Sequence, residues 1–91
     1  MHIVISYDIQ DDKRRLKIHK ALKDYGTWVQ YSVFECHLKQ KELLRLRHRL
    51  KQLLGDNPDD SIRFYGLCEE CAAKIERIGG IVPPEDGAMI V

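Results

Sequence analysis

The residue of this sequence best placed to do chemistry is Asp8, the carboxylate that ends the run His2–Asp8. The β-branched and aromatic side chains of that run predict a short buried strand, and strand ends are where sheets expose functional groups. Mg²⁺ prefers octahedral oxygen ligation, which one carboxylate does not supply. A symmetric dimer whose axis passes near Asp8 would bring two copies together and relieve this shortage. The alternative is that Asp8 only caps the following loop or helix.

Positive charge is concentrated in the first part of the chain. Residues 1–54 carry a net charge of +6 and residues 55–91 a net charge of −5, within a total of +1. Arg14 and Arg15 follow Asp8 closely enough to share a phosphate with it, because a guanidinium bonds phosphate oxygens through two N–H groups. A track for the backbone of duplex DNA would continue over Lys39, Lys41, Arg45, Arg47, Arg49 and Lys51. The alternative is that the predicted helices only expose these charges to solvent.

Two further sets of residues carry weaker signals. Cys68 and Cys71 form a single C-x-x-C motif, which together with Cys36 and His37 would make a four-ligand zinc site. Without a second paired motif, we favour the interpretation of Cys36 and Cys71 as small core residues. Four aromatic side chains on predicted strands could stack on nucleic-acid bases: Tyr31, Phe34, Phe64 and Tyr65. Because the aromatic signature of RNA-recognition modules is absent, we interpret all four as core residues.

Two helices and three or four strands must position these residues. Asp11 and Asp12 supply N-cap chemistry for a helix to about Tyr25, and Gly26 has the type of a left-handed residue that ends it. The run 27–38 is extended, as one bent strand or two, and a helix follows over 40–54, closed by Gly55. Its apolar stripe is predicted to contain Leu43, Leu46, Leu50 and Leu53, widened by Leu44 and Leu54.

The remaining elements complete an α+β pattern. The run 61–67 reads as a strand, 68–80 is ambiguous with a short helical turn as one solution, and 88–91 reads as a final short strand. The order predicts a ferredoxin-like β-α-β-β-α-β antiparallel sheet with two helices on one face and a short C-terminal strand. We expect one domain over 1–91, with the tail 81–91 pairing with a partner's sheet edge or with its own sheet.

Composition excludes several classes of protein. Apolar residues make up 44% of the 91 residues and charged residues 32%, which is too apolar for a disordered chain. No stretch approaches the roughly 18 apolar residues that cross a bilayer, and the N-terminus does not have the pattern of a signal peptide. Three cysteines, an odd number, argue against a disulfide framework. We therefore expect a cytoplasmic protein with no membrane partner.

Three segments resemble one known family. The run YDIQDDKRRLKIHKAL at 7–22, then YGTWVQYSVFE at 25–35 and later IRFYGLCEEC at 62–71, resemble the small CRISPR-associated adaptation protein, the second of the two core Cas proteins, often labelled an endoribonuclease. The resemblance spans essentially the whole chain. One departure is Trp28, which stands where many relatives have a basic residue and so removes a phosphate contact if that position faces the cleft.

The resemblance implies a ferredoxin-like homodimer with Asp8 as catalytic residue and Mg²⁺ ligand at the dimer cleft. It implies that Tyr7, Arg14 or Arg15, and Phe34 line this cleft, and that the C-terminal strand docks on the partner. It further implies Mg²⁺-dependent cleavage of single-stranded RNA or double-stranded DNA, and spacer acquisition on duplex DNA beside the CRISPR integrase subunit. The alternatives are a non-catalytic structural DNA-binding adaptor and a VapD-like toxin ribonuclease of related fold.

Overall fold

The computed structural model describes residues 1–83 and confirms the α+β, ferredoxin-like architecture. The strands are β1 (His2–Asp8), β2 (Gly26–Gln30), β3 (Val33–His37) and β4 (Ser61–Leu67). The helices are α1 (Asp12–Lys23), α2 (Gln40–Leu54) and the short α3 (Glu69–Ala73). The predicted strand at 88–91 and most of the tail 81–91 lie outside the described residues.

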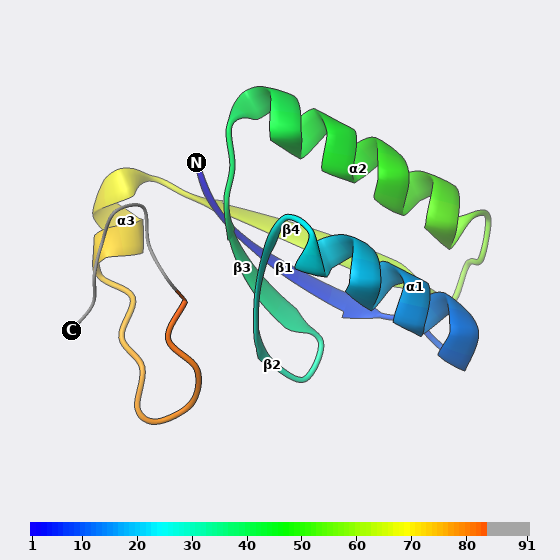
Figure 1. The fold of residues 1–91 in the computed structure, drawn as a ribbon, viewed down its shortest axis with the longest axis horizontal. Coiled ribbons are helices and arrows are strands. Elements are labelled where there is room, and N and C mark those ends of the chain that lie inside the picture. Colours follow the sequence, from blue (N-terminus) through cyan, green and yellow to red (C-terminus); the bar gives the residue numbers. More distant parts are fainter. Residues whose placement is uncertain (84–91) are drawn as a thin grey trace.

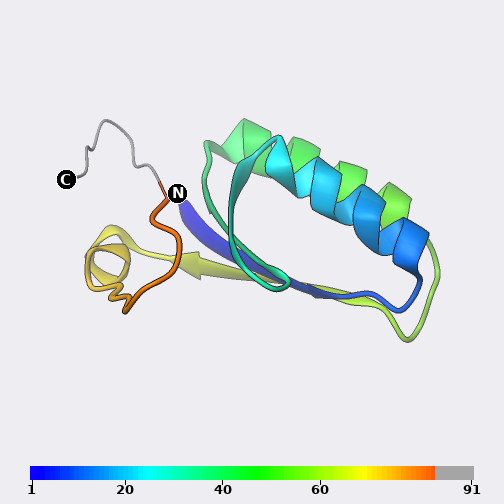
Figure 2. The same cartoon turned by 60° about the horizontal axis from the view of Figure 1, so that its bottom comes forward.

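The four strands form one antiparallel sheet in the order β2-β3-β1-β4. β1 lies in the middle, with Ile5 opposite Phe34 of β3 on one side and opposite Phe64 of β4 on the other. Figure 1 shows α1 and α2 side by side over this sheet, and Figure 2 shows that both cover the same face. Within residues 1–83 no helix covers the opposite face of the sheet, as the sequence predicts.

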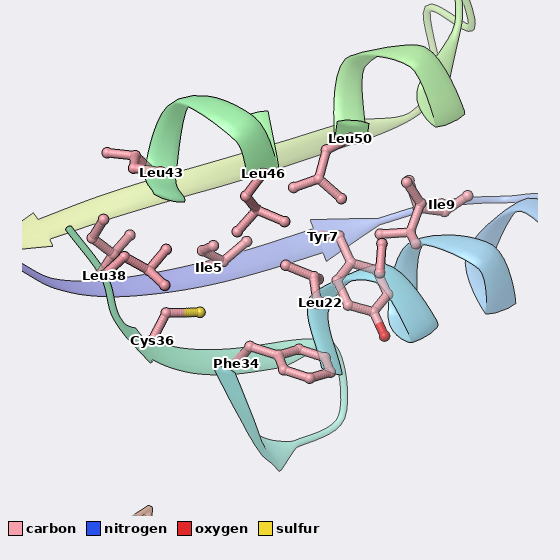
Figure 3. Close-up of a cluster of buried hydrophobic side chains, with 13 residues drawn as sticks. Ile5, Tyr7, Ile9, Leu22, Phe34, Cys36, Leu38, Leu43, Leu46 and Leu50 are labelled. Atoms are coloured by element: carbon pink, nitrogen blue, oxygen red, sulfur yellow. The ribbon is translucent and has the colours of Figure 1, made fainter. Parts of the chain in front are cut away.

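The core lies between the sheet and the two helices (Figure 3). Ile5, Ile18 and Phe34 have no exposed surface, which shows that alternate residues of each strand and one stripe of each helix face inward. On α2 the predicted stripe is confirmed for Leu43, Leu46 and Leu50. Leu44 is instead 51% exposed, so its assignment to the stripe was wrong: one helical step turns it about 100° from Leu43.

The region after α1 differs from the prediction. α1 ends at Lys23 with Asp24 as its C-cap, and Gly26 is the first residue of β2 with no positive φ. Gly26 is required for another reason: a Cβ there would lie 2.3 Å from Sγ of Cys36. The extended run 27–38 is two strands, because the chain turns at Tyr31, which has a φ of 40°.

The predictions of which residues begin α1 and end α2 are confirmed. The Asp11 side chain accepts a 2.8 Å hydrogen bond from the backbone N–H of Arg14 and so caps α1. Gly55 ends α2 with a φ of 65°. Among the described residues, no helix has both the length and the apolar character needed to span a membrane.

Candidate nucleic-acid site

Asp8 lies at the end of β1 and is exposed. It faces Ser61 across the β1–β4 ladder, and on its other side the backbone N–H of Tyr7 donates a 3.1 Å hydrogen bond to the carbonyl of Ser32. The Asp8 carboxylate forms no hydrogen bond or ion pair within residues 1–83. Its two oxygens are therefore available to a cation or another ligand, between the β2–β3 turn and the start of β4.

Arg14 is held by Asp60, the residue before the ladder partner of Asp8. Nε and Nη2 of Arg14 each lie 2.7 Å from Oδ2 of Asp60, whose other oxygen accepts a 3.0 Å bond from the backbone N–H of Gln10. The Asp60 side chain is only 1% exposed. The backbone N–H of Gln10 and then Arg14 hold the pKa of this carboxyl below its usual value, against the effect of burial. This clamp fixes the loop between β1 and α1 to the start of β4.

Arg15 is also engaged within the chain. Its Nη1 donates a 2.9 Å hydrogen bond to the carbonyl of Ile9, and its Nη2 forms an ion pair with Asp12. The guanidinium is still partly exposed, with 42% of the side-chain surface accessible. Both arginines thus shape the loop that follows Asp8. Whether either one also binds a phosphate stays a prediction.

Tyr7 and Phe34 belong to a buried aromatic cluster around His19 of α1. The Tyr7 hydroxyl lies 2.9 Å from Nδ1 of His19, and the ring of Phe34 meets His19 edge-to-face at 5.1 Å. Burial raises the pKa of Tyr7 and lowers the pKa of His19, the second with help from the positive charge of Lys23. Phe34 has no exposed surface, and Tyr7 only 6%, so in the single chain neither ring lines an open cleft (Figure 3).

The interpretation of all four strand aromatics as core is correct for part of the set. Phe34 is buried and Phe64 packs against the core, where its ring lies 5.7 Å from the guanidinium carbon of Arg47. Tyr31 is 89% exposed because it lies on the turn, and Tyr65 is 47% exposed because it points to the sheet face without helices. Both were wrongly assigned to the core.

One basic residue near Asp8 was missed. Arg63 of β4 pairs with Ser6, two positions from the Asp8–Ser61 pair, and so shares the helix-free sheet face with Asp8. Its Nη1 lies 3.4 Å from the Tyr65 hydroxyl. The alternation of β4 could have indicated this placement, since Ile62 and Phe64 had to face the core.

The predicted basic track, on and just before α2, is exposed. All six residues of the predicted track are accessible to solvent, namely Lys39, Lys41, Arg45, Arg47, Arg49 and Lys51, and exposed lysines of α1 add to this charge: Lys13, Lys17, Lys20 and Lys23. Arg49 is partly neutralised by a 2.9 Å ion pair with Asp24.

The end of the sheet away from Asp8 holds a cavity rather than a basic surface. A cavity of about 920 Å³ there is lined by His2, Glu35, His37 and Cys68, among others.

The cysteines do not assemble a zinc site within residues 1–83, the interpretation that the sequence did not favour. Cys36 is buried in the core, and its burial raises the pKa of its thiol to about 11. Cys68 and Cys71 are exposed, so Cys71 is not a core residue, and the N–H of Cys71 lies 3.3 Å from Sγ of Cys68. No group of three or more His, Cys, Asp or Glu side chains in the described part of the chain is arranged to hold a metal ion.

Comparison with known proteins identifies the family. A family model described as CRISPR associated protein Cas2 matches residues 1–75. The CRISPR-associated endoribonuclease Cas2 1 of Chloroflexus aurantiacus is 48% identical over 85 residues, which is 93% of this chain and 91% of the relative. Cas2 2 of Methanospirillum hungatei, also named an endoribonuclease, is 41% identical over 83 residues, 91% of each chain.

Solved structures agree. Streptococcus pyogenes Cas2 superposes with a TM-score of 0.73 at 37% identity, covering 87% of this chain and 100% of that one. A chain of a partial Cas6-RT-Cas1–Cas2 complex superposes with a TM-score of 0.70 at 33% identity, covering 85% of this chain and 89% of that one. The sequence motifs, the sheet topology and these similarities together show that the chain belongs to the CRISPR-associated Cas2 family.

Proposed function

We propose that this chain is a homodimeric subunit of the CRISPR spacer-acquisition machinery that binds duplex DNA beside an integrase subunit and cleaves phosphodiester bonds at Asp8. The observation that carries the nuclease part is the exposed, unpaired carboxylate of Asp8 at the end of the central strand. Relatives named endoribonuclease and endonuclease support the activity. A solved complex that contains a Cas1 and a Cas2 chain supports the partner.

The proposed Mg²⁺ needs a second copy of the chain. Asp8 is the one carboxylate at its site with no partner within residues 1–83, and those residues form no three-ligand cluster. Two Asp8 carboxylates facing each other across a two-fold axis would fit the cation, with phosphate and water oxygens as the other ligands. When bound there, a divalent cation neutralises phosphate charge and lowers the pKa of a bound water. The protein's own part is to hold the two carboxylates in place.

The helix-free sheet face supports the homodimer. Val4 and Val33 of this face are only partly covered, and Tyr65 is 47% exposed. Apolar side chains gathered on an uncovered face favour association with another protein surface. The described start of the tail, with Ile81 and Val82 exposed, adds apolar surface that a partner could cover. We therefore propose that this face and the tail 81–91 pair with a second copy.

The test of the nuclease proposal compares Asp8→Ala with Asp56→Ala, an exposed loop carboxylate as control. Single-stranded RNA and duplex DNA are incubated with each variant and Mg²⁺, and the dimer is checked by light scattering. We expect Asp8→Ala to lose about 100-fold or more of the cleavage rate while remaining dimeric, because a metal ligand is removed. Equal cleavage by Asp8→Ala and wild type would remove the catalytic proposal.

A structural adaptor without catalysis is favoured by one observation, namely that Arg14 and Arg15, the two arginines that follow Asp8 in the sequence, are bonded within the chain. If Asp8→Ala abolishes cleavage in solution but spacer acquisition in cells is intact, the adaptor role is the biological one. A CRISPR array and an integrase gene beside the gene for this chain would exclude the toxin alternative.

Duplex binding has its own test. Exposed cations on α1 and α2 would contact phosphates, so log K for duplex DNA should fall linearly with log salt, by about 0.9 per neutralised phosphate. Arg45→Ala removes one exposed cation and should reduce that slope by about 1 if Arg45 is in contact. Gln52→Ala on the same helix is the uncharged control. An affinity that hardly changes with salt would contradict backbone contact.

A further inference from the structure

Two aromatic rings are exposed where the β2–β3 hairpin turns. Trp28 of β2 is 40% exposed, and Tyr31 on the turn is 89% exposed. In Figure 1 the hairpin projects below the sheet, on the side away from α2. Two exposed aromatic rings at one turn offer flat apolar surface on which a ligand or a partner can pack.

Hydrogen bonding and packing hold the indole in place. Nε1 of Trp28 donates a 2.8 Å hydrogen bond to the carbonyl of Tyr31, which spans the turn and accompanies the φ of 40° at Tyr31. On its other side the indole meets His19 edge-on at 6.4 Å. The rings of Trp28 and Tyr31 do not contact each other, so each keeps surface for a ligand. A ring that is already ordered loses little entropy on binding.

The turn lies beside the Asp8 end of β1. The hydrogen bond from Tyr7 N–H to Ser32 connects the residue before Asp8 with the residue after Tyr31. Positive charge lies near the same region: Lys20 and Lys23 are exposed in the last turn of α1, close in the chain to His19, the residue against which Trp28 packs. Exposed aromatic rings flanked by cations are the combination that binds single-stranded nucleic acid, through base stacking and phosphate attraction.

We propose that Trp28 and Tyr31 form a stacking site for unpaired nucleobases at the β2–β3 turn, where Trp28, opposite Phe34 in the ladder, lies on the helix side of the sheet. This proposal rests on the proposed function, since it assumes that nucleic acid approaches this end of the sheet. In an intact duplex both faces of each base are already stacked. The site therefore favours single-stranded over double-stranded ligand, whereas the cations of α1 and α2 serve both.

The single tryptophan of the sequence allows a direct test. Intrinsic fluorescence of the full chain is followed during titration with oligothymidylate and, separately, with a duplex of equal length. EDTA prevents metal-dependent cleavage, and pH 8 keeps His19 neutral, so neither complicates the signal. We expect strong quenching by the single strand and little by the duplex, because only the single strand presents free base faces.

Variants separate stacking from general binding. Affinity for labelled oligothymidylate should fall about 5- to 100-fold in Trp28→Ala and in Tyr31→Ala, and much less in Trp28→Phe, which keeps a ring. Leu44→Ala removes an exposed apolar side chain from α2 and should leave affinity unchanged. Duplex affinity should change little in all four variants, which also shows that each is folded.

Other outcomes overturn the inference. If Trp28→Ala and Tyr31→Ala bind the single strand as wild type does, or if the duplex quenches equally, the rings do not stack on unpaired bases. If these variants instead lose dimerisation or binding to the integrase with nucleic-acid affinity intact, the rings belong to a protein interface. If the duplex affinity of the wild-type chain does not depend on salt, the proposed function is contradicted. The quenching by the single strand still tests the stacking site, so the two failures are distinguishable.

Discussion

Replacement of Phe34 by alanine distinguishes a packing role from a role at the substrate. The ring has no exposed surface and contacts two other rings, Tyr7 at a centroid distance of 6.4 Å and His19 at 5.1 Å. Truncation of a buried Phe to Ala costs about 3–5 kcal/mol through lost burial and the cavity left behind. A domain of this size has only about 5–15 kcal/mol of stability, so Phe34→Ala should lose a large share of it.

The measurement is urea unfolding followed by far-UV circular dichroism at one fixed protein concentration, since a dimer's stability depends on concentration. With a urea dependence of about 1–2 kcal/mol per M, the midpoint should fall by on the order of 2 M. Phe34→Leu keeps most of the apolar volume and should lose roughly 1–2 kcal/mol. Tyr31→Ala, at an 89% exposed position, is the control and should shift stability by less than about 0.5 kcal/mol.

Cleavage per folded molecule completes the comparison. A residue that only packs leaves this rate near wild type in Phe34→Leu. If Phe34→Ala loses less than about 1 kcal/mol and yet abolishes cleavage, the ring acts on the substrate and the reasoning from burial is refuted.

Three further perturbations follow from the same structure. Gly26→Ala should destabilise the fold by about 1–3 kcal/mol or more, because its Cβ would clash in the core. Gly66→Ala is the control and should not, because no atom lies within 4 Å of the position of its Cβ. Equal urea midpoints for the two variants would contradict this. Because the pKa of Asp60 is lowered in the folded state, its ionised carboxylate stabilises the fold above about pH 4, and this stability is lost as the pH falls through the folded-state pKa. Asp60→Asn should therefore be less stable than wild type at pH 7, and the two stabilities should converge in acid. Urea titrations at a series of pH values measure both. His19 also has a lowered pKa in the folded state, so its protonation favours the unfolded chain and the free energy of unfolding should rise with pH up to about 6.5. His19→Gln should flatten this rise. An unchanged pH profile in the variant would show that His19 does not cause it.

Local patterns were sufficient for the order of elements. The alternation of His2–Asp8 and the apolar period of residues 40–54 depend only on neighbours in the chain, and both elements form where they were predicted. The same holds for Asp11 as an N-cap and for Gly55 as the residue that closes α2. From these elements and the quoted family motifs, the sequence alone led to the ferredoxin-like fold and to the Cas2 family.

Contacts between distant residues were decided by the tertiary structure. Arg14 and Asp60 are 46 residues apart, and no local pattern marks them as a pair, so a predicted phosphate ligand proved to be bonded to a buried carboxylate. The turn at Tyr31 likewise takes this residue out of the strands, so Tyr31 is exposed although it lies within an extended run, whereas Phe34 of β3 is buried. Periodicity tells which side chains share a face, but only the packed chain shows which face is covered and which partner each charge meets.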